Sequence, residues 1–411
     1  MTCLRGIAYT PGFAHSSRVM GTYTETSHQS WGSRFGDSIK GVLFGVLLFF
    51  AAFPLLFWNE GRAVERARQL EQGMGAVVSI SATALAPDNE GKLVHLTAQL
   101  MSEQTLSDMD FKVSTDALAL RRVVEVFQVQ EIKHTETRET AGGGEETKTT
   151  YEYKRIWSER LIDSDHFNQN AMRELKVKER NPDSKPYDNW STMARVIRAG
   201  AFELSPKLKS QLDDFTGLTL GEKDHDALPK KLRKKLDLHN GMFYIARKPD
   251  KPRVGDARIK FQILRAPPQG VTIIAQQRGN SFAEYPIEGA DPLEQVLLPG
   301  TVSAAQHFGA EMESNEQLTW ILRVVGFLMM SVGLFLIAGP LVRIADLIPL
   351  IGDVLAMGAF IVAAAFSLPF TLITIAMGWL FYRPIIAIPL LLFAVVNITL
   401  VFVLRKKRHS A

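Results

Sequence analysis

The 411-residue chain contains four long apolar runs, which are its predicted membrane spans. The first run, residues 41–58, carries no charged residue. Crossing the hydrocarbon core of a bilayer takes roughly 17 to 25 such residues, because an unpaired backbone amide in lipid costs several kcal/mol. Three more runs lie at residues 324–342, 354–380 and 385–404. The pattern predicts a multi-pass α-helical membrane protein with four spans.

The long stretch between the first two spans, residues 59–320, predicts a mixed, β-dominated domain outside the bilayer. Alternating or β-rich stretches predict strands at residues 76–85, 92–101, 122–132, 148–157, 258–264 and 271–277. In the fifth of these, Ile259, Phe261 and Ile263 alternate with polar residues, which predicts one buried face.

Other segments of this domain carry different signals. Residues 191–204 and 226–238 are more helical in composition. The triple glycine at residues 142–144 lies between two predicted strands and is typical of a hairpin tip. The domain is therefore expected to contain some helix beside its strands.

The positions of basic residues predict which side of the membrane each part occupies. The basic tail, residues 405–411, begins with Arg-Lys-Lys-Arg directly after the fourth span, and cytoplasmic flanks carry an excess of Lys and Arg. Four spans place both termini on one side, so this tail and the polar arm of residues 1–40 are expected in the cytoplasm. The domain is then extracytoplasmic, in a lumen or periplasm. Arg62, Arg66 and Arg68 follow the first span and argue against this orientation, but long translocated domains obey the charge rule weakly.

Charge and cysteine content narrow the functions that fit the chain. The net charge of +4 is a mild basic excess that does not indicate a nucleic-acid partner. The single cysteine, Cys3, excludes an intramolecular disulfide and a thiolate zinc site. A basic run at residues 230–235 is typical of a solvated helix face, with an anionic lipid patch as the alternative.

No catalytic, metal-binding or cofactor-binding motif stands out in the sequence. There is no HExxH, GxSxG, Walker A or GxGxxG pattern, and His95 has no second histidine at a metal-ligand spacing. We therefore expect no enzyme activity and no cofactor. A membrane hydrolase of unfamiliar geometry is a third and weaker hypothesis, which activity-based hydrolase probes would test.

Charged residues at the ends of the C-terminal spans leave a second functional class open. Arg343, Asp346, Asp353 and Arg383 flank the predicted helices, where snorkelling or pairing favours a structural role. Ionisable groups at depth in a bilayer also mark ion paths. The leading hypothesis is a non-enzymatic membrane organiser, and a transporter or channel is the alternative.

Small residues recur at helical spacing on the third span. Ala359, Ala363 and Ser367 allow two helices to approach closely, and Asn397 of the fourth span offers a polar contact. Close packing is a main source of helix association in lipid. Contact between copies, which would give a homo-oligomer, and packing within one chain stay equally open.

A series of short motifs runs in order along nearly the whole chain. They are Asn59-Glu60-Gly61-Arg62-Ala63, the turn-and-strand motif Asn89-Glu90-Gly91-Lys92-Leu93-Val94-His95, residues 120–128 (LRRVVEVFQ), the YxYxxxW pattern of residues 151–157, Asn181-Pro182, Val254-Gly255-Asp256, Gln276-Gln277-Arg278-Gly279, and residues 378–384 (GWLFYRP) with Arg383. Together these motifs resemble the transmembrane protein 43 (LUMA) family.

The resemblance implies a four-span protein of the endoplasmic reticulum and inner nuclear membrane with a luminal domain. It also implies self-association and nuclear-envelope organisation through lamin- and emerin-type proteins, with the lipid bilayer as a constant partner. Bacterial relatives imply the cell (inner) membrane instead. The N-terminal extension and the basic tail depart from the animal pattern, so the nuclear partners transfer least.

The motif residues are predicted to have structural roles. Asn59 and Gly61 are expected to end the first helix in a left-handed cap, with Glu60 and Arg62 at the headgroup level. The Asn89-Glu90-Gly91 segment is expected to form a tight turn that leads into a strand. Both motifs would then fix the orientation of the domain over the membrane.

Overall fold

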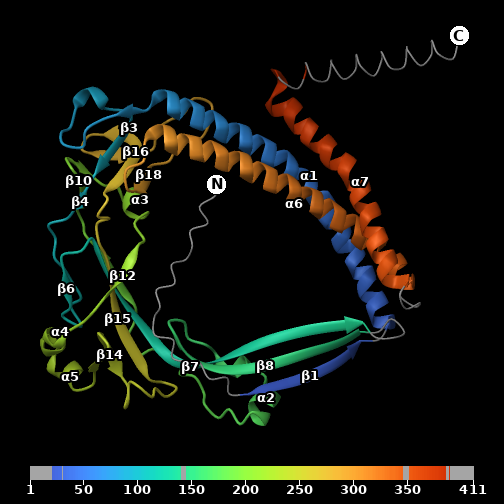
Figure 1. Ribbon diagram of the computed structural model, residues 1–411, viewed down its shortest axis with the longest axis horizontal. Helices are drawn as coiled ribbons and strands as arrows, with labels where there is room; N and C mark the ends of the chain where they lie inside the picture. The colour runs from blue at the N-terminus through green and yellow to red at the C-terminus, as the bar shows by residue number, and fades with distance from the viewer. Residues whose placement is uncertain (1–20, 30, 140–144, 346–350, 386–387, 389–411) are drawn as a thin grey trace.

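The computed structural model describes residues 21–29, 31–139, 145–345, 351–385 and 388 of the chain. A β-rich domain lies at one end of two long helices, α1 and α6, which run side by side in an arch (Figure 1). A third helix, α7, packs against both at the far end of the arch. Strands β1, β7 and β8 extend from the domain towards that same far end.

The three long helices correspond to the first three predicted spans. Helix α1 covers Trp31–Ala76, α6 covers Ala304–Ala345 and α7 covers Ile351–Tyr382. Each is long and apolar enough to cross a membrane, and these three are the spans found among the described residues. The membrane class is thus confirmed. The fourth predicted span, residues 385–404, lies outside the described residues except at 385 and 388.

The expected helix end after the first span is wrong. Helix α1 does not end in a cap at Asn59 and Gly61 but continues to Ala76. Likewise, α6 begins at Ala304, well before the apolar run at residues 324–342. The polar motif after the first span is compatible with a continuous helix because its side chains bond to α6 and α7. We call the paired segments 59–76 and 304–323 the stalk.

The larger of two main sheets is antiparallel. Its order is β1-β8-β7-β15-β14-β13, with β12 paired to β15 and β9 paired to β7. Its strands are β1 (Thr22–Gln29), β7 (Ala119–Glu139), β8 (Glu145–Ser158), β9 (Trp190–Met193), β12 (Phe215–Leu218), β13 (Asp237–His239), β14 (Met242–Ile245) and β15 (Ala257–Leu264). Because β7 and β8 are much longer than β15, their outer parts project beyond the body of the sheet.

The second main sheet has the order β17-β16-β3-β2, with β18 paired to β16. It contains β2 (Val78–Ser79), β3 (Leu93–Ala98), β16 (Val271–Arg278), β17 (Ser281–Ala283) and β18 (Val296–Pro299). Two small sheets are formed by β4 (Leu100–Met101), β10 (Arg198–Ala199) and β11 (Phe202–Glu203), and by β5 (Leu106–Ser107) and β6 (Ser114–Thr115). The short helices are α2 (Gln169–Glu174), α3 (Pro206–Lys209), α4 (Glu222–Ala227) and α5 (Lys230–Arg233).

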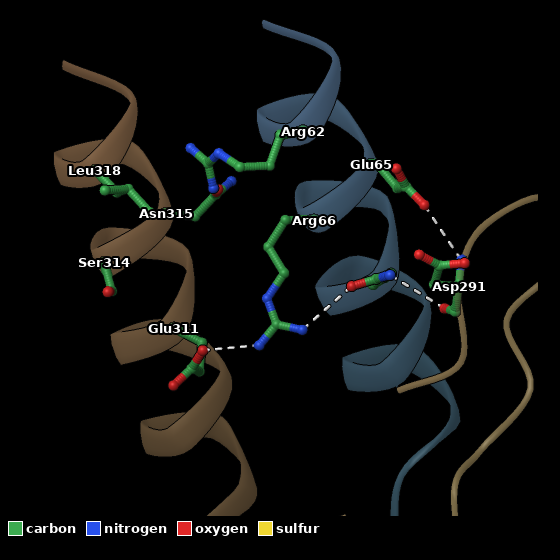
Figure 2. Close-up of a pocket in the computed structure, with 9 residues that line it drawn as sticks. Arg62, Glu65, Arg66, Asp291, Glu311, Ser314, Asn315 and Leu318 are labelled. Atoms are coloured by element: carbon green, nitrogen blue, oxygen red, sulfur yellow. Dashed lines mark hydrogen bonds and ion pairs between the residues drawn. The ribbon is translucent and has the colours of Figure 1, made fainter. Parts of the chain in front are cut away.

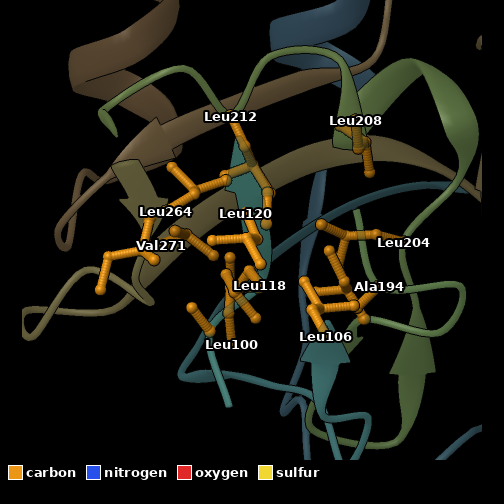
Figure 3. Close-up of a cluster of buried hydrophobic side chains, with 14 of the residues drawn as sticks. Leu100, Leu106, Leu118, Leu120, Ala194, Leu204, Leu208, Leu212, Leu264 and Val271 are labelled. Carbon is orange, nitrogen blue, oxygen red and sulfur yellow. The ribbon is translucent and has the colours of Figure 1, made fainter. Parts of the chain in front are cut away.

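The main core of the domain gathers apolar side chains from both sheets. Leu120 and Leu264 from the larger sheet converge with Val271 from the second (Figure 3). The predicted face of β15 is confirmed, since Ile259, Phe261 and Ile263 are 0%, 1% and 1% exposed. β15 therefore supplies one wall of this core.

A smaller cluster attaches the stalk to the second sheet. Leu70 of α1 and Phe308 of α6 are fully buried against Leu93 and Ile274. A Cβ atom at Gly73 would lie 2.9 Å from the Phe308 ring, so the helix fits closely against its neighbour there. The helices that enter the membrane block are therefore also part of the domain core.

Other predictions of local structure had mixed outcomes. Of the predicted strand at residues 76–85, only Val78–Ser79 forms a strand, β2, and Ala76 belongs to α1. The helix expected at 191–204 is wrong, since short strands β9, β10 and β11 form there. Residues 226–238 contain the end of α4, then α5, and lead into β13. The triple glycine lies outside the described residues, although Glu139 pairs with Glu145 on either side of it.

The pairing of β1 conflicts with the predicted placement of residues 1–40. Strand β1 precedes α1 in the chain, yet it pairs with β8 along its whole length. The predicted topology puts these two strands on opposite faces of the membrane. A ladder of backbone hydrogen bonds cannot form across a bilayer, so this pairing and that topology exclude each other.

Candidate functional site: a polar junction of three helices

The centre of the helical block is a buried carboxylate. Glu60 of α1 is 2% exposed and accepts hydrogen bonds from Nε and Nη2 of Arg323, at 2.7 and 2.8 Å. The same carboxylate accepts a bond from Trp379 Nε1 at 2.9 Å. Because Arg323 lies on α6 and Trp379 on α7, one side chain connects all three helices. Two-point pairing of guanidinium and carboxylate is among the stronger polar contacts in proteins.

A second polar layer lies beside this carboxylate, between α1 and α6. Asn59 is fully buried and donates from Nδ2 to the Thr319 carbonyl at 3.1 Å. Arg62 donates to Asn315 Oδ1 and to Thr319 Oγ1, both at 3.0 Å. Asn315 in turn donates to the Ala63 carbonyl at 3.0 Å. These bonds give Asn59 and Arg62 partners on α6 although both lie inside a continuous helix, and the buried Nε of Arg62 is left without a partner.

Polar pairing continues along the stalk towards the domain (Figure 2). Arg66 lies between Glu311 of α6, at 2.8 Å, and Gln69 of its own helix, at 3.2 Å. Gln69 also donates to the Asp291 carbonyl at 3.1 Å. A cavity of about 290 Å³ opens among these side chains. Arginines and acidic residues both line it, so the cavity has no strong preference for one sign of charge.

Glycines let two of the sequence motifs approach each other across helices. A Cβ atom at Gly61 would lie 2.6 Å from the Tyr382 ring, and one at Gly378 would lie 2.9 Å from Glu60 Cβ. Such distances leave no room for a side chain at either position. The motif after the first span and the motif at the end of α7 are therefore two halves of one junction. Arg383 follows directly, and its backbone N–H donates to the Trp379 carbonyl at 2.8 Å.

Two further sequence motifs, Asn89–His95 and Gln276–Gly279, meet in the domain. The Glu90 carboxylate accepts from the backbone N–H of Gly279 at 2.8 Å, and Gln276 donates to the Gly91 carbonyl at 2.9 Å. Gly91 has φ +76°, a conformation that favours glycine, and the preceding Pro87–Asn89 segment is a 3₁₀ turn, as expected of a tight turn. Arg278 is exposed and takes no part in this contact.

Both ring nitrogens of His95 lie within hydrogen-bond distance of neighbouring protein groups. One ring nitrogen lies 3.1 Å from the Ser79 hydroxyl, and the other lies 2.8 Å from the Val302 carbonyl oxygen. The histidine thus connects β2, β3 and the segment before α6. Among the described residues, no group of three or more histidine, cysteine or acidic side chains could hold a metal ion.

The small-residue stripe of α7 faces the interior of the chain. Ala363 is 6% exposed and Ser367 is fully buried, while Ala359 is half-buried. One turn further on, the Thr371 hydroxyl contacts the Met330 sulfur of α6 at 3.4 Å. The structure therefore favours packing within one chain over contact between copies. Asn397 lies outside the described residues.

The chemistry of the junction is ion pairing and hydrogen bonding. Its carboxylate, Glu60, accepts hydrogen bonds from two side chains, Arg323 and Trp379. The side chains of Arg343, Asp346 and Asp353, on which the transport alternative depends, lie outside the residues whose side chains the structure describes.

Sequence reasoning missed the partners of the junction, Arg323, Trp379, Thr319 and Asn315. A usable signal was present, because Glu60 follows the first apolar run and Arg323 directly precedes the second. Antiparallel neighbouring spans bring such flanking residues to the same level, and opposite charges there predict a pair.

Fold and junction together define a class: an integral membrane protein whose β-rich domain stands on helices that continue into the membrane block. Within that class, the family model described as "Transmembrane protein 43" matches residues 126–384. Transmembrane protein 43 of Mus musculus is 32% identical over 361 residues, covering 86% of this chain and 87% of the relative. The Homo sapiens protein is 32% identical over 365 residues, covering 86% and 88%. The chain belongs to the transmembrane protein 43 family.

A more distant relative and the solved structures complete the comparison. The Drosophila melanogaster protein named "Transmembrane protein 43 homolog" is 28% identical over 358 residues, covering 85% of this chain and 91% of its own. No solved structure matches the chain. The family resemblance predicted from the short motifs is confirmed.

Proposed function

We propose that this protein is a non-enzymatic membrane organiser that holds its β-rich domain in a fixed position at the bilayer, associates with its own copies and recruits other membrane proteins. The observation that carries the proposal is the junction centred on Glu60. It joins α1, α6 and α7 at the point where two of these helices leave the apolar block for the domain.

The stalk connects the junction rigidly to the domain. No loop interrupts α1 or α6 between the apolar block and the domain. The segment beyond Trp58 adds about 27 Å of helix, at a rise of ~1.5 Å per residue. Arg66–Glu311 and the Leu70–Phe308 cluster bind the two helices together further along. A domain held in this way has a fixed orientation, which suits a surface that positions partners.

The partners and the membrane follow from the family resemblance. In a eukaryotic cell we expect the endoplasmic reticulum and inner nuclear membrane, with lamin- or emerin-type proteins as partners. In a bacterium we expect the cell (inner) membrane and envelope proteins. Because the stripe on α7 is buried within the chain, self-association requires another surface.

The proposal is tested by cross-linking the full-length protein in its native membrane. We expect wild type to give discrete cross-linked oligomers, and Glu60→Ala to lose them while its domain remains protease-resistant. Glu71→Ala removes an exposed carboxylate of the same helix and should leave the oligomers unchanged.

A contrary result is equally concrete. A wild-type protein that stays monomeric under these conditions, yet gives single-channel currents or ion flux in planar bilayers, contradicts the organiser and favours the transport alternative.

A further inference from the structure

The cavity in the stalk lies at the level of lipid headgroups. Trp58 of α1 and Trp320 of α6 are 56% and 57% exposed, and tryptophan side chains are enriched where hydrocarbon meets water. Arg62, the lining residue of α1 closest to the apolar run, lies ~6 Å along the helix from Trp58. The headgroup layer on one side of a bilayer is about 5 to 7 Å thick. The cavity therefore begins within that layer and continues towards the domain.

Arg62 brings a positive charge without a carboxylate partner to this cavity. Among the described residues, its guanidinium donates only to neutral side chains, those of Asn59, Asn315 and Thr319. Its Nε is buried and makes no hydrogen bond. Arg66, in contrast, already pairs with a carboxylate of α6 at 2.8 Å. A guanidinium with neutral partners and an unused donor favours an added anion, because bonds to a charged acceptor are the stronger ones.

Two carboxylates lie on the other side of the same cavity. Glu65 follows Arg62 at i+3 on α1, yet the two do not pair. The Arg62 guanidinium points to α6, whereas the Glu65 carboxylate accepts from the backbone N–H of Asp291 at 3.3 Å (Figure 2). In the part of the chain that the structure describes, neither Glu65 nor Asp291 forms an ion pair with a basic side chain. Charges of opposite sign thus remain separated and unneutralised on either side of the cavity.

This arrangement fits a small zwitterion that carries a phosphate at one end and a primary ammonium at the other. A primary ammonium donates three hydrogen bonds, which suits carboxylates. A quaternary ammonium is instead recognised by aromatic rings, and no aromatic residue is found among the described residues that line the cavity. A volume of about 290 Å³ is at the small end of ligand pockets, so it suits a headgroup rather than a whole lipid.

We propose that the stalk cavity binds the phosphoethanolamine headgroup of a phospholipid in the surrounding bilayer, with the phosphate at Arg62 and the ammonium at Glu65 and Asp291. Leu318, which lines the cavity on α6 and is 42% exposed, gives the glycerol end of the lipid an apolar contact. A lipid held there would fix the height of the stalk relative to the membrane surface. The inference adds a ligand site and does not depend on the proposed organising function.

Lipid retention by the full-length protein tests the site. The protein is purified in detergent and incubated with an equimolar mixture of phosphatidylethanolamine, phosphatidylcholine and phosphatidylglycerol of identical acyl chains, and the retained lipids are quantified by mass spectrometry. We expect phosphatidylethanolamine to be enriched about tenfold over each of the others, because each lacks one charge-assisted contact. Equal retention of all three lipids overturns the proposal.

The same chemistry occurs in free glycerophosphoethanolamine, which is tested separately by calorimetry. It should bind far more weakly than the lipid, because it has no acyl chains to hold it at the membrane boundary. Tight binding of the free compound together with no retained lipid overturns the assignment to the bilayer.

Two variants separate recognition from stability. Arg62→Gln should reduce retention of phosphatidylethanolamine about tenfold, but Arg62 also bonds to α6. Glu65→Gln alters an exposed side chain, so it should keep the Tm of wild type while losing the preference for phosphatidylethanolamine over phosphatidylglycerol. Glu71→Gln, an exposed carboxylate of α1 outside the cavity, should keep the full preference. Wild-type selectivity in both Arg62→Gln and Glu65→Gln would show that the cavity does not bind the headgroup.

Discussion

The core of the β-rich domain and the junction of the helical block are held together by different means. The domain core is a contiguous set of apolar side chains in which Phe111, Phe243 and Phe261 are nearly inaccessible. The helical block buries a charged group, Glu60, and an amide, Asn59, and brings Gly45 into contact with the backbone of Gly333.

The difference reflects the solvent of each region. In water, removing apolar surface stabilises a fold by about 25 cal/mol per Å². In lipid that gain is nearly absent, and helices associate through close packing and polar contacts. A Cβ atom at Gly45 would lie 2.7 Å from the Gly333 carbonyl oxygen, so these helix backbones touch directly. The four predictions below test whether each region depends on the contacts assigned to it.

The largest effect is expected in the domain core. Phe261→Asp places a carboxylate among apolar rings, and even Phe→Ala at such a position costs about 3 to 5 kcal/mol. That loss is comparable with the whole stability of many domains. We expect the protease-resistant fragment of the full-length protein to disappear in limited proteolysis. Lys260→Gln alters the neighbouring outward-facing residue and should keep the fragment. Survival of both would show that the register of β15 is wrong.

Removal of the junction carboxylate is expected to have the next largest effect. Glu60→Ala leaves the Arg323 guanidinium buried without its partner, and breaking a buried ion pair costs about 3 to 5 kcal/mol. We expect a clear fall in the Tm of the detergent-solubilised protein, while the domain fragment stays protease-resistant. Glu71→Ala is the matched control. An unchanged Tm for both variants would exclude a stabilising role for the junction.

The sequence predicted the domain better than the junction, and the reason is physical. The alternation in residues 258–264 reports burial directly, because strand side chains point to opposite faces. The continuation of α1 past Trp58 could not be read in this way. Asn59 and Gly61 favour a helix end locally, and only the bond that Asn59 donates to the Thr319 carbonyl and the close approach of Tyr382 to Gly61 make the helical form stable.

The pairing of β1 shows the same limit. Hydropathy marks residues 41–58 as a span, but it contains no information about which strand residues 22–29 will join. That pairing depends on the long register between β7 and β8, which is a tertiary property. In contrast, the turn at Asn89–Gly91 was predictable because its glycine has a backbone conformation that few other residues adopt.

A smaller effect is expected for the stripe on α7. Ala363→Leu adds volume to a buried contact within the chain, and overpacking typically costs about 1 to 3 kcal/mol. We expect a lower Tm in detergent with no loss of cross-linked oligomers. Val362→Leu enlarges an exposed neighbour and should leave the Tm unchanged. Loss of oligomers from a monomer of normal stability would instead place this stripe between copies.

The smallest effect is expected from an ion-pair cluster on the larger sheet. This prediction measures how much charge pairing, as distinct from apolar burial, adds to the stability of the domain. Burial raises the pKa of Glu125, but Arg258 and Lys260, each at 2.6 Å, outweigh this and hold the pKa below its usual value. A carboxyl group with a lowered folded pKa stabilises the fold fully above its unfolded pKa, about 4.3. The contribution is lost as the pH falls through the folded pKa.

Between pH 5 and strongly acidic solution, the free energy of unfolding of wild type should therefore fall by on the order of 1 kcal/mol more than that of Glu125→Gln. Urea unfolding of the domain signal over this range measures the difference, and parallel pH profiles for the two proteins would show that the cluster adds nothing to stability.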